Sequence, residues 1–170
     1  YKKDLKEAIY RFMANNAYLN IKKNEKHENY CMVIHTHYRI AQHKQDKETV
    51  QDIISTLEGN NVEKKRKLLT SIQKEVKKIS LNTKDQNDIM TYIYDKITSS
   101  TQLFILNSKN DIQDNIQALE CPSKFTFIFG GNTLSRGVTF KNMLSFYFSR
   151  SVKNALQQNT YVQIARHFGY

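Results

Sequence analysis

Phe125-Thr-Phe-Ile-Phe129 is an apolar run that leads directly into a glycine-rich segment, Gly130-Gly-Asn-Thr-Leu-Ser-Arg-Gly-Val-Thr-Phe140. The run is typical of a buried strand that ends in a turn. Glycines let a backbone approach a ligand closely, and the polar side chains between them suit phosphate oxygens. Such a loop at the carboxyl end of a strand predicts an α/β fold and indicates nucleotide-dependent work on nucleic acid. An ordinary strand-to-helix turn is the alternative.

The rest of the sequence predicts strands that alternate with helices. Short apolar runs typical of buried strands occur at residues 30–34, 103–106 and 143–148. Apolar residues at helical spacing occur at residues 5–17, 50–57, 65–79 and 89–97. The predicted fold class is therefore a three-layer α/β domain with a parallel sheet and a helical insertion at about residues 60–100. The single proline, Pro122, is expected just before the strand at 125–129.

The composition indicates one basic domain with a polyanionic partner. A chain of 170 residues that is 39% hydrophobic is long enough for one domain with a proper core, and too short for two. Its 26 basic and 16 acidic residues give a net charge of +10, which favours nucleic acid or, less specifically, an anionic membrane surface. Residues 121–170 contain six basic residues and no acidic residue, so we expect phosphate groups to bind in this third of the chain.

Cysteine usage and hydropathy predict a cytoplasmic location. Cys31 and Cys121 are the only cysteines, and they have no metal-ligand spacing. Each lies beside or within an apolar segment, where a free cysteine behaves as a small hydrophobic residue. No apolar run in the sequence approaches the length of a membrane span, so we expect no membrane partner.

Three blocks of the sequence resemble the Z-one domain of bacterial endonucleases, a domain associated with superfamily-two helicase ATPases. These blocks are Gly130–Thr139, Tyr147–Arg150 and Gln163–Tyr170. Weaker similarity covers most of the chain, so residues 1–170 are expected to be a single domain of this type. Ala165 and His167 stand where the family usually has Gly and Trp. The chain ends inside the last block, which predicts a fragment truncated at its C-terminus.

The resemblance implies the second RecA-like lobe of an ATP-dependent, helicase-like DNA translocase in a bacterial restriction or defence system. The sequence contains no P-loop motif, so an N-terminal P-loop lobe of the same protein would have to grip the β- and γ-phosphates. ATP with Mg is the implied cofactor, bound jointly by the two lobes, and DNA is the implied partner. We therefore expect the chain to be inactive by itself.

The resemblance also implies roles for individual residues. Arg166 is the implied catalytic arginine finger, with Gln163 as its catalytic neighbour; a surface arginine near a helix end is the alternative. The implied cofactor-binding residues are Gly137, Val138, Thr139, Gln163 and Arg166. The implied nucleic-acid-binding residues are His35, Arg39, Gly131, Asn132, Thr133, Ser135 and Arg136. Because Thr139 stands where the family usually has a ribose-contacting Asp, a direct ribose contact is not assigned.

Other patterns leave alternatives open. His35 and His37 either meet a phosphate backbone or close a strand, and no metal site is predicted because no acid or cysteine nearby completes a ligand set. The basic run Lys64–Lys67 is continued by Lys74, Lys77 and Lys78. It is either a DNA-contacting helix face or a solvated one. The aromatic residues that either stack on bases or pack in the core are Tyr147, Phe148 and Phe168.

Two rival functions follow from the same sequence. A nuclease domain needs clustered carboxylates to hold metals, whereas Asp85, Asp88 and Asp95 are interpreted as surface acids. Any nuclease activity is therefore expected in another domain or subunit. The non-enzymatic alternative is a basic α/β module that only binds nucleic acid.

Overall fold

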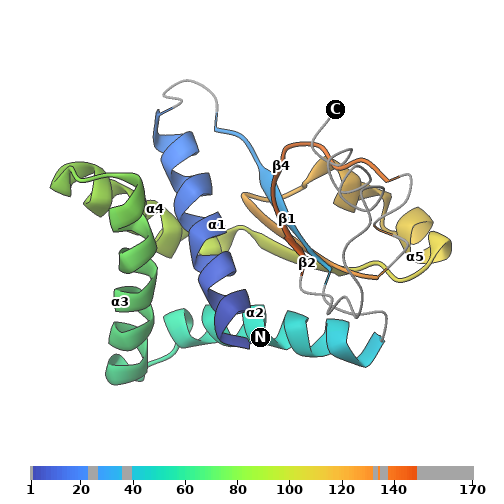
Figure 1. The fold of residues 1–170 in the computed structure, drawn as a ribbon, viewed down its shortest axis with the longest axis horizontal. Helices are drawn as coiled ribbons and strands as arrows, with labels where there is room; N and C mark the ends of the chain where they lie inside the picture. Colours follow the sequence, from blue (N-terminus) through green and yellow to red (C-terminus); the bar gives the residue numbers. More distant parts are fainter. Residues whose placement is uncertain (1, 23–26, 36–39, 132–133, 135–137, 149–170) are drawn as a thin grey trace, which may run out of the picture.

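Four strands form one parallel sheet in the order β2-β3-β1-β4 (Figure 1). The structure is a computed structural model, and it describes residues 2–22, 27–35, 40–131, 134 and 138–148. The strands are β1 (Tyr30–His35), β2 (Thr101–Ile105), β3 (Phe125–Phe129) and β4 (Met143–Phe148). Each of them coincides within a few residues with a predicted strand, and Pro122 precedes β3 as expected.

The two inner strands, β1 and β3, are buried at every position. The core on one face takes alternate residues from both strands: Tyr30, Met32, Ile34, Phe125, Phe127 and Phe129. The intervening residues Cys31, Val33 and Ile128 lie in a second core on the opposite face. Strands covered on both faces have no polar side to present, which explains why these strands are apolar apart from His35 and Thr126.

Helices cover both faces of the sheet (Figure 1). The first core is covered by α1 (Lys2–Lys22), α2 (Ile40–Glu58), α3 (Val62–Ile79) and α4 (Thr83–Ser99). The second core is covered by α5 (Lys109–Asp114) and the short 3-10 helix η1 (Ile116–Glu120). The prediction of a three-layer α/β domain with a parallel sheet is confirmed.

Residues 60–100 form the two helices α3 and α4, each of which begins at an asparagine cap. The Asn61 side chain accepts a hydrogen bond from the Lys64 backbone N–H at 2.9 Å. Asn82 accepts one from the Lys84 backbone N–H at 2.8 Å. These caps satisfy donors that the first turn of a helix leaves without partners. The apolar stripes of α3 and α4 pack against α1, so this segment completes the first core.

Helix α2 begins at Ile40, earlier than the stripe at residues 50–57 indicates. Two polar residues in the first half of α2 explain why the apolar stripe starts later than the helix. His43 and Asp46 continue the spacing of Val50 and Ile53 toward the N-terminus, and their side chains are buried as well. The apolar stripe therefore underestimates the length of this helix, because part of the helix's buried face is polar.

The second core brings the two cysteines together, although they are far apart in sequence. Both side chains are buried, and both thiols face the backbone oxygen of Lys141. A hydrogen bond with Cys121 and burial raise the pKa of the Cys31 thiol far above its ordinary value. Thiols of this kind are packing groups, because the thiolate is the reactive form.

Candidate functional site

The candidate site lies at the edge of the sheet where all four strands end. Because the strands are parallel, His35, Leu106 and Gly130 follow or end neighbouring strands at the same edge. The Gly130 N–H donates to the Ile34 oxygen at 3.2 Å, and the Leu106 N–H donates to the Phe129 oxygen at 2.8 Å. The start of the glycine-rich segment is thus tied to the ends of both neighbouring strands.

Gly130 has no room for a side chain. An added Cβ would lie 2.3 Å from the Leu106 oxygen and 2.5 Å from Leu134 Cδ1. The sequence suggested that glycine serves close approach to a ligand here, but close approach of the protein's own backbone is the reason at this position. The Leu134 N–H donates to the Gly131 oxygen at 3.0 Å and closes a turn.

His43 of α2 reaches the same edge. Its side chain is 1% exposed, and Nδ1 lies 2.5 Å from Oδ1 of Asn107, which follows β2. An amide oxygen can only accept, so Nδ1 carries the hydrogen of this bond. The bond connects α2 to the end of β2 and orients the imidazole.

Asp46 lies one turn further along α2, and its side chain is 2% exposed. Its Oδ1 accepts a hydrogen bond from Gln42 Nε2 at 3.5 Å. Carboxylates are rarely buried to this degree unless they are paired or hydrogen-bonded. Sequence analysis missed this residue. The available signal was the position of two polar residues, His43 and Asp46, in register with the apolar stripe of α2.

The segment after β2 leads into α5, which begins with a capping box. Asp111 Oδ2 accepts hydrogen bonds from the backbone N–H groups of Asn107 at 2.7 Å and Ser108 at 3.0 Å, while Ser108 Oγ accepts one from the Asp111 N–H. The bond from the Asn107 N–H is the main cause that lowers the pKa of Asp111. The cap holds Asn107 in place beside His43.

His35 ends β1 and is 2% exposed. Its ring stacks on Phe148 at 5.1 Å between centroids and 15° between planes, and on Phe146 at 6.5 Å. Phe146 and Phe148 are also 6.5 Å apart, so the three nearly parallel rings form a triangle at the ends of β1 and β4. Phe148 thus packs against the His35 ring of the protein itself. Packing was one of the two alternatives that the sequence left open for Phe148, the other being stacking on bases.

Of the predicted site residues, His35, Gly131, Val138 and Thr139 lie in the described part of the chain. Gly131 is buried in the turn, and Val138 is half-buried against the second core. Thr139 is exposed. The predicted residues outside the described ranges are Arg39, Asn132, Thr133, Ser135, Arg136, Gly137, Gln163 and Arg166.

The carboxylates considered for a nuclease lie on α4, away from this edge. Asp85 is paired with Lys22 at 3.0 Å, and Asp95 with Lys96 at 2.7 Å. Within the described ranges, no group of three His, Cys, Asp or Glu side chains is arranged to hold a metal ion. None of the described helices is both long and apolar enough to cross a membrane.

Fold and site together define a parallel α/β domain with a glycine turn and a buried polar cluster at the carboxyl edge of its sheet. The chain belongs to the Z1 domain family, whose model matches residues 4–170. The match confirms the domain to which the sequence blocks point. No curated protein and no solved structure matches the chain.

Proposed function

We propose that this chain is the second RecA-like lobe of an ATP-dependent, helicase-like DNA translocase that works in a bacterial restriction or defence system. The observation that carries the proposal is the Gly130-Gly131 turn, which is locked against the ends of neighbouring parallel strands. Ligands of open α/β sheets bind outside the carboxyl ends of the strands. The bonded pair of His43 and Asn107 lies at the same edge.

The residues of this region suit a bound nucleotide phosphate. Residues 121–170 carry no Asp or Glu, so no carboxylate from this third of the chain repels phosphate oxygens. The Thr139 hydroxyl is exposed at the end of the glycine-rich segment. ATP with its Mg ion, held jointly with a P-loop lobe, supplies the phosphoryl group whose hydrolysis drives the motor. Gly137, Val138 and Thr139 line the nucleotide on this side.

Arg166 and Gln163 act when the two lobes close. The Arg166 guanidinium places its charge opposite the γ-phosphoryl group, which is worth about 10³ to 10⁵ in rate for arginine fingers. The same closure would bring Gln163 to the phosphates. Asn132, Thr133, Ser135 and Arg136 hold the DNA backbone, so a shift of their loop moves the lobe along the strand.

The test is a set of parallel measurements on the full-length protein: ATP hydrolysis with and without duplex DNA, DNA binding, and DNA cleavage with Mg. A motor hydrolyses ATP faster when DNA is present. Cleavage that requires divalent metal but not ATP would instead assign this domain to a nuclease. Salt-dependent DNA binding without any ATP hydrolysis would identify a binding module.

A further inference from the structure

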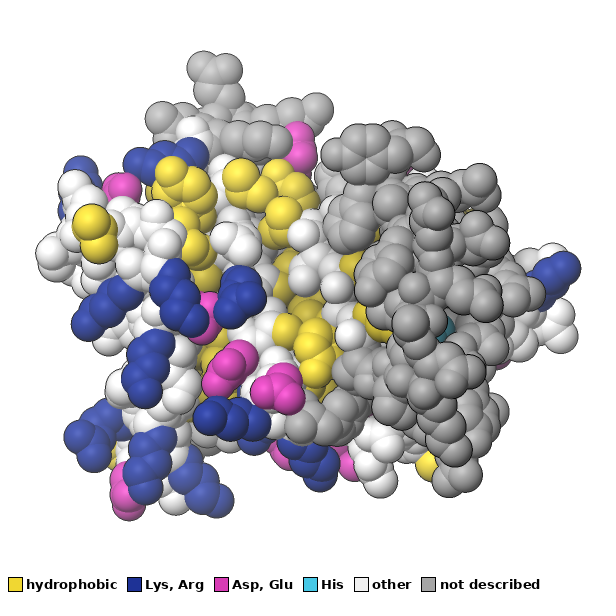
Figure 2. Space-filling view, viewed as in Figure 1, with side chains coloured by type: hydrophobic (Ala, Val, Ile, Leu, Met, Phe, Trp, Pro, Cys, Tyr) yellow, Lys and Arg dark blue, Asp and Glu magenta, His cyan; other side chains and the backbone are white. Residues whose placement is uncertain are grey.

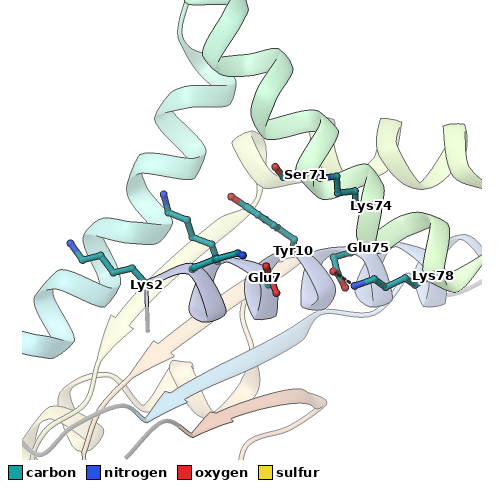
Figure 3. A pocket seen from close by; sticks show the side chains of 9 residues that line it. Lys2, Glu7, Tyr10, Ser71, Lys74, Glu75 and Lys78 are labelled. Atoms are coloured by element: carbon teal, nitrogen blue, oxygen red, sulfur yellow. Dashed lines mark hydrogen bonds and ion pairs between the residues drawn. The ribbon is translucent and has the colours of Figure 1, made fainter.

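A second surface of the molecule is strongly basic, and it lies on the helices rather than at the sheet edge. A groove of about 710 Å³ runs between α1 and α3 (Figure 3). Five lysines and two glutamates line it, together with Tyr10 and Ser71. The lysines are Lys2, Lys3, Lys6, Lys74 and Lys78, and the glutamates are Glu7 and Glu75. Figure 2 shows Lys and Arg side chains gathered where α3 lies.

One of the two glutamates is already neutralised. The Glu75 side chain is 5% exposed, and its carboxylate bonds to Arg11 Nε at 3.0 Å and to Lys78 Nζ at 2.5 Å. Burial alone would raise the pKa of Glu75, but the hydrogen bonds from Lys78 and Arg11 outweigh burial and lower it. Glu75 therefore stays ionised and organises the floor of the groove without adding an uncompensated negative charge.

The basic surface continues along α3 beyond this groove. A smaller hollow of about 290 Å³ shares Lys6, Tyr10 and Ser71 with the groove and adds Lys64 and Lys67. The α3 lysines at 64, 67, 74 and 78 are spaced by three, seven and four residues, so they follow one face of the helix. At about 1.5 Å per residue this row is roughly 21 Å long. A DNA strand presents about six phosphates over that length.

Most of these cations are available to a partner. Among the described residues, no carboxylate lies within ion-pair distance of Lys6, Lys64 or Lys74. Lys67 is paired with Glu63, and both of those side chains are exposed. Burial raises the pKa of Tyr10, so its hydroxyl stays protonated and is a donor at the wall of the groove.

We propose that the α1–α3 groove is a second DNA-contact surface, in which lysines of both helices bind the phosphate backbone of a duplex. The proposal rests on the proposed function in one respect, because it takes DNA as the partner. A linear row of lysines suits a phosphate backbone, and the groove offers no apolar anchor for a bilayer. The large apolar side chains that are exposed in the described structure, Val62, Leu81, Tyr94 and Ile116, do not line it.

The experiment measures the salt dependence of DNA binding by the full-length protein. The test variant is Lys6→Gln with Lys74→Gln, and the matched control is Lys44→Gln with Lys84→Gln, two exposed lysines on α2 and α4 outside the groove. Binding of a short fluorescein-labelled duplex is followed by anisotropy from about 50 to about 200 mM salt. Loss of two phosphate contacts makes the negative slope of log K against log salt shallower by about 1.8. The control keeps the wild-type slope.

Each outcome decides the proposal. A test variant with the slope and affinity of the control overturns it, and if DNA still stimulates ATP hydrolysis the proposed function survives. A full-length protein that binds no DNA overturns both. As a probe of the bilayer alternative, vesicles of phosphatidylserine are titrated in parallel. If the lysine pair affects vesicle binding but not DNA binding, the groove is a membrane contact and the proposal fails.

Discussion

Gly130→Ala should destabilise the domain, because the new methyl group clashes with neighbouring atoms. Its Cβ would lie 2.3 Å from the Leu106 backbone oxygen. An ordinary contact between carbon and oxygen is about 3.3 Å, so the methyl group comes about 1 Å too close. The oxygen cannot swing away, because the N–H of the same peptide group, that of Asn107, is bonded to Asp111 Oδ2 at 2.7 Å, and Leu106 is buried. Overpacking of this kind costs about 3 kcal/mol, near the upper end of its usual range.

Urea denaturation followed by circular dichroism measures this cost. With a slope of about 2 kcal/mol per molar urea, a loss of about 3 kcal/mol lowers the midpoint by about 1.5 M. Gly59→Ala is the matched control. Its Cβ would lie 3.0 Å from the Ser55 oxygen, so a small shift relieves the contact and the expected cost is about 1 kcal/mol or less. Equal midpoints for Gly130→Ala and wild type would refute the reasoning.

Three further predictions concern other contacts. Asn107→Ala removes the acceptor of the buried His43 bond and should cost about 1 to 3 kcal/mol in the same urea assay, whereas an unchanged midpoint would mean that the bond adds nothing. Glu75→Gln should lower stability by about 1 kcal/mol at neutral pH. The pKa of Glu75 is lowered in the folded state, so its contribution to stability is present above the unfolded-state pKa of about 4.3 and is lost as the pH falls through the folded-state pKa. The thermal unfolding temperatures of variant and wild type should therefore converge in acid. Cys31 and Cys121 should resist Ellman's reagent in the native protein and react after unfolding, and rapid native labelling of either would contradict their packing role.

The sheet could be predicted because its strands appear in the sequence as short apolar runs. Residues 30–34 and 125–129 are buried on both faces, so every position except Thr126 is apolar. The first half of α2 could not be found in this way. There the buried positions hold His43 and Asp46, and polar residues are read as solvent-exposed unless their partners are known.

Contacts between distant segments account for most of what the sequence does not reveal. Glycine at 130 is a visible feature, but the reason for it is a carbonyl of residue 106 that only the folded sheet brings near. The lysine run of α3 is equally visible. Its opposition to the lysines of α1, with the Glu75 ion pairs between them, depends on how the two helices pack.

The measurement that tests the central claim most directly is DNA-stimulated ATP hydrolysis by the full-length protein, wild type against Arg166→Ala, with DNA binding followed in parallel. Arg166→Lys is the matched variant that keeps the charge but lacks the guanidinium fork. The account predicts that Arg166→Ala lowers turnover by about 10³-fold or more while DNA affinity is retained, and that lysine does not restore the rate. Unchanged turnover in Arg166→Ala would contradict the account.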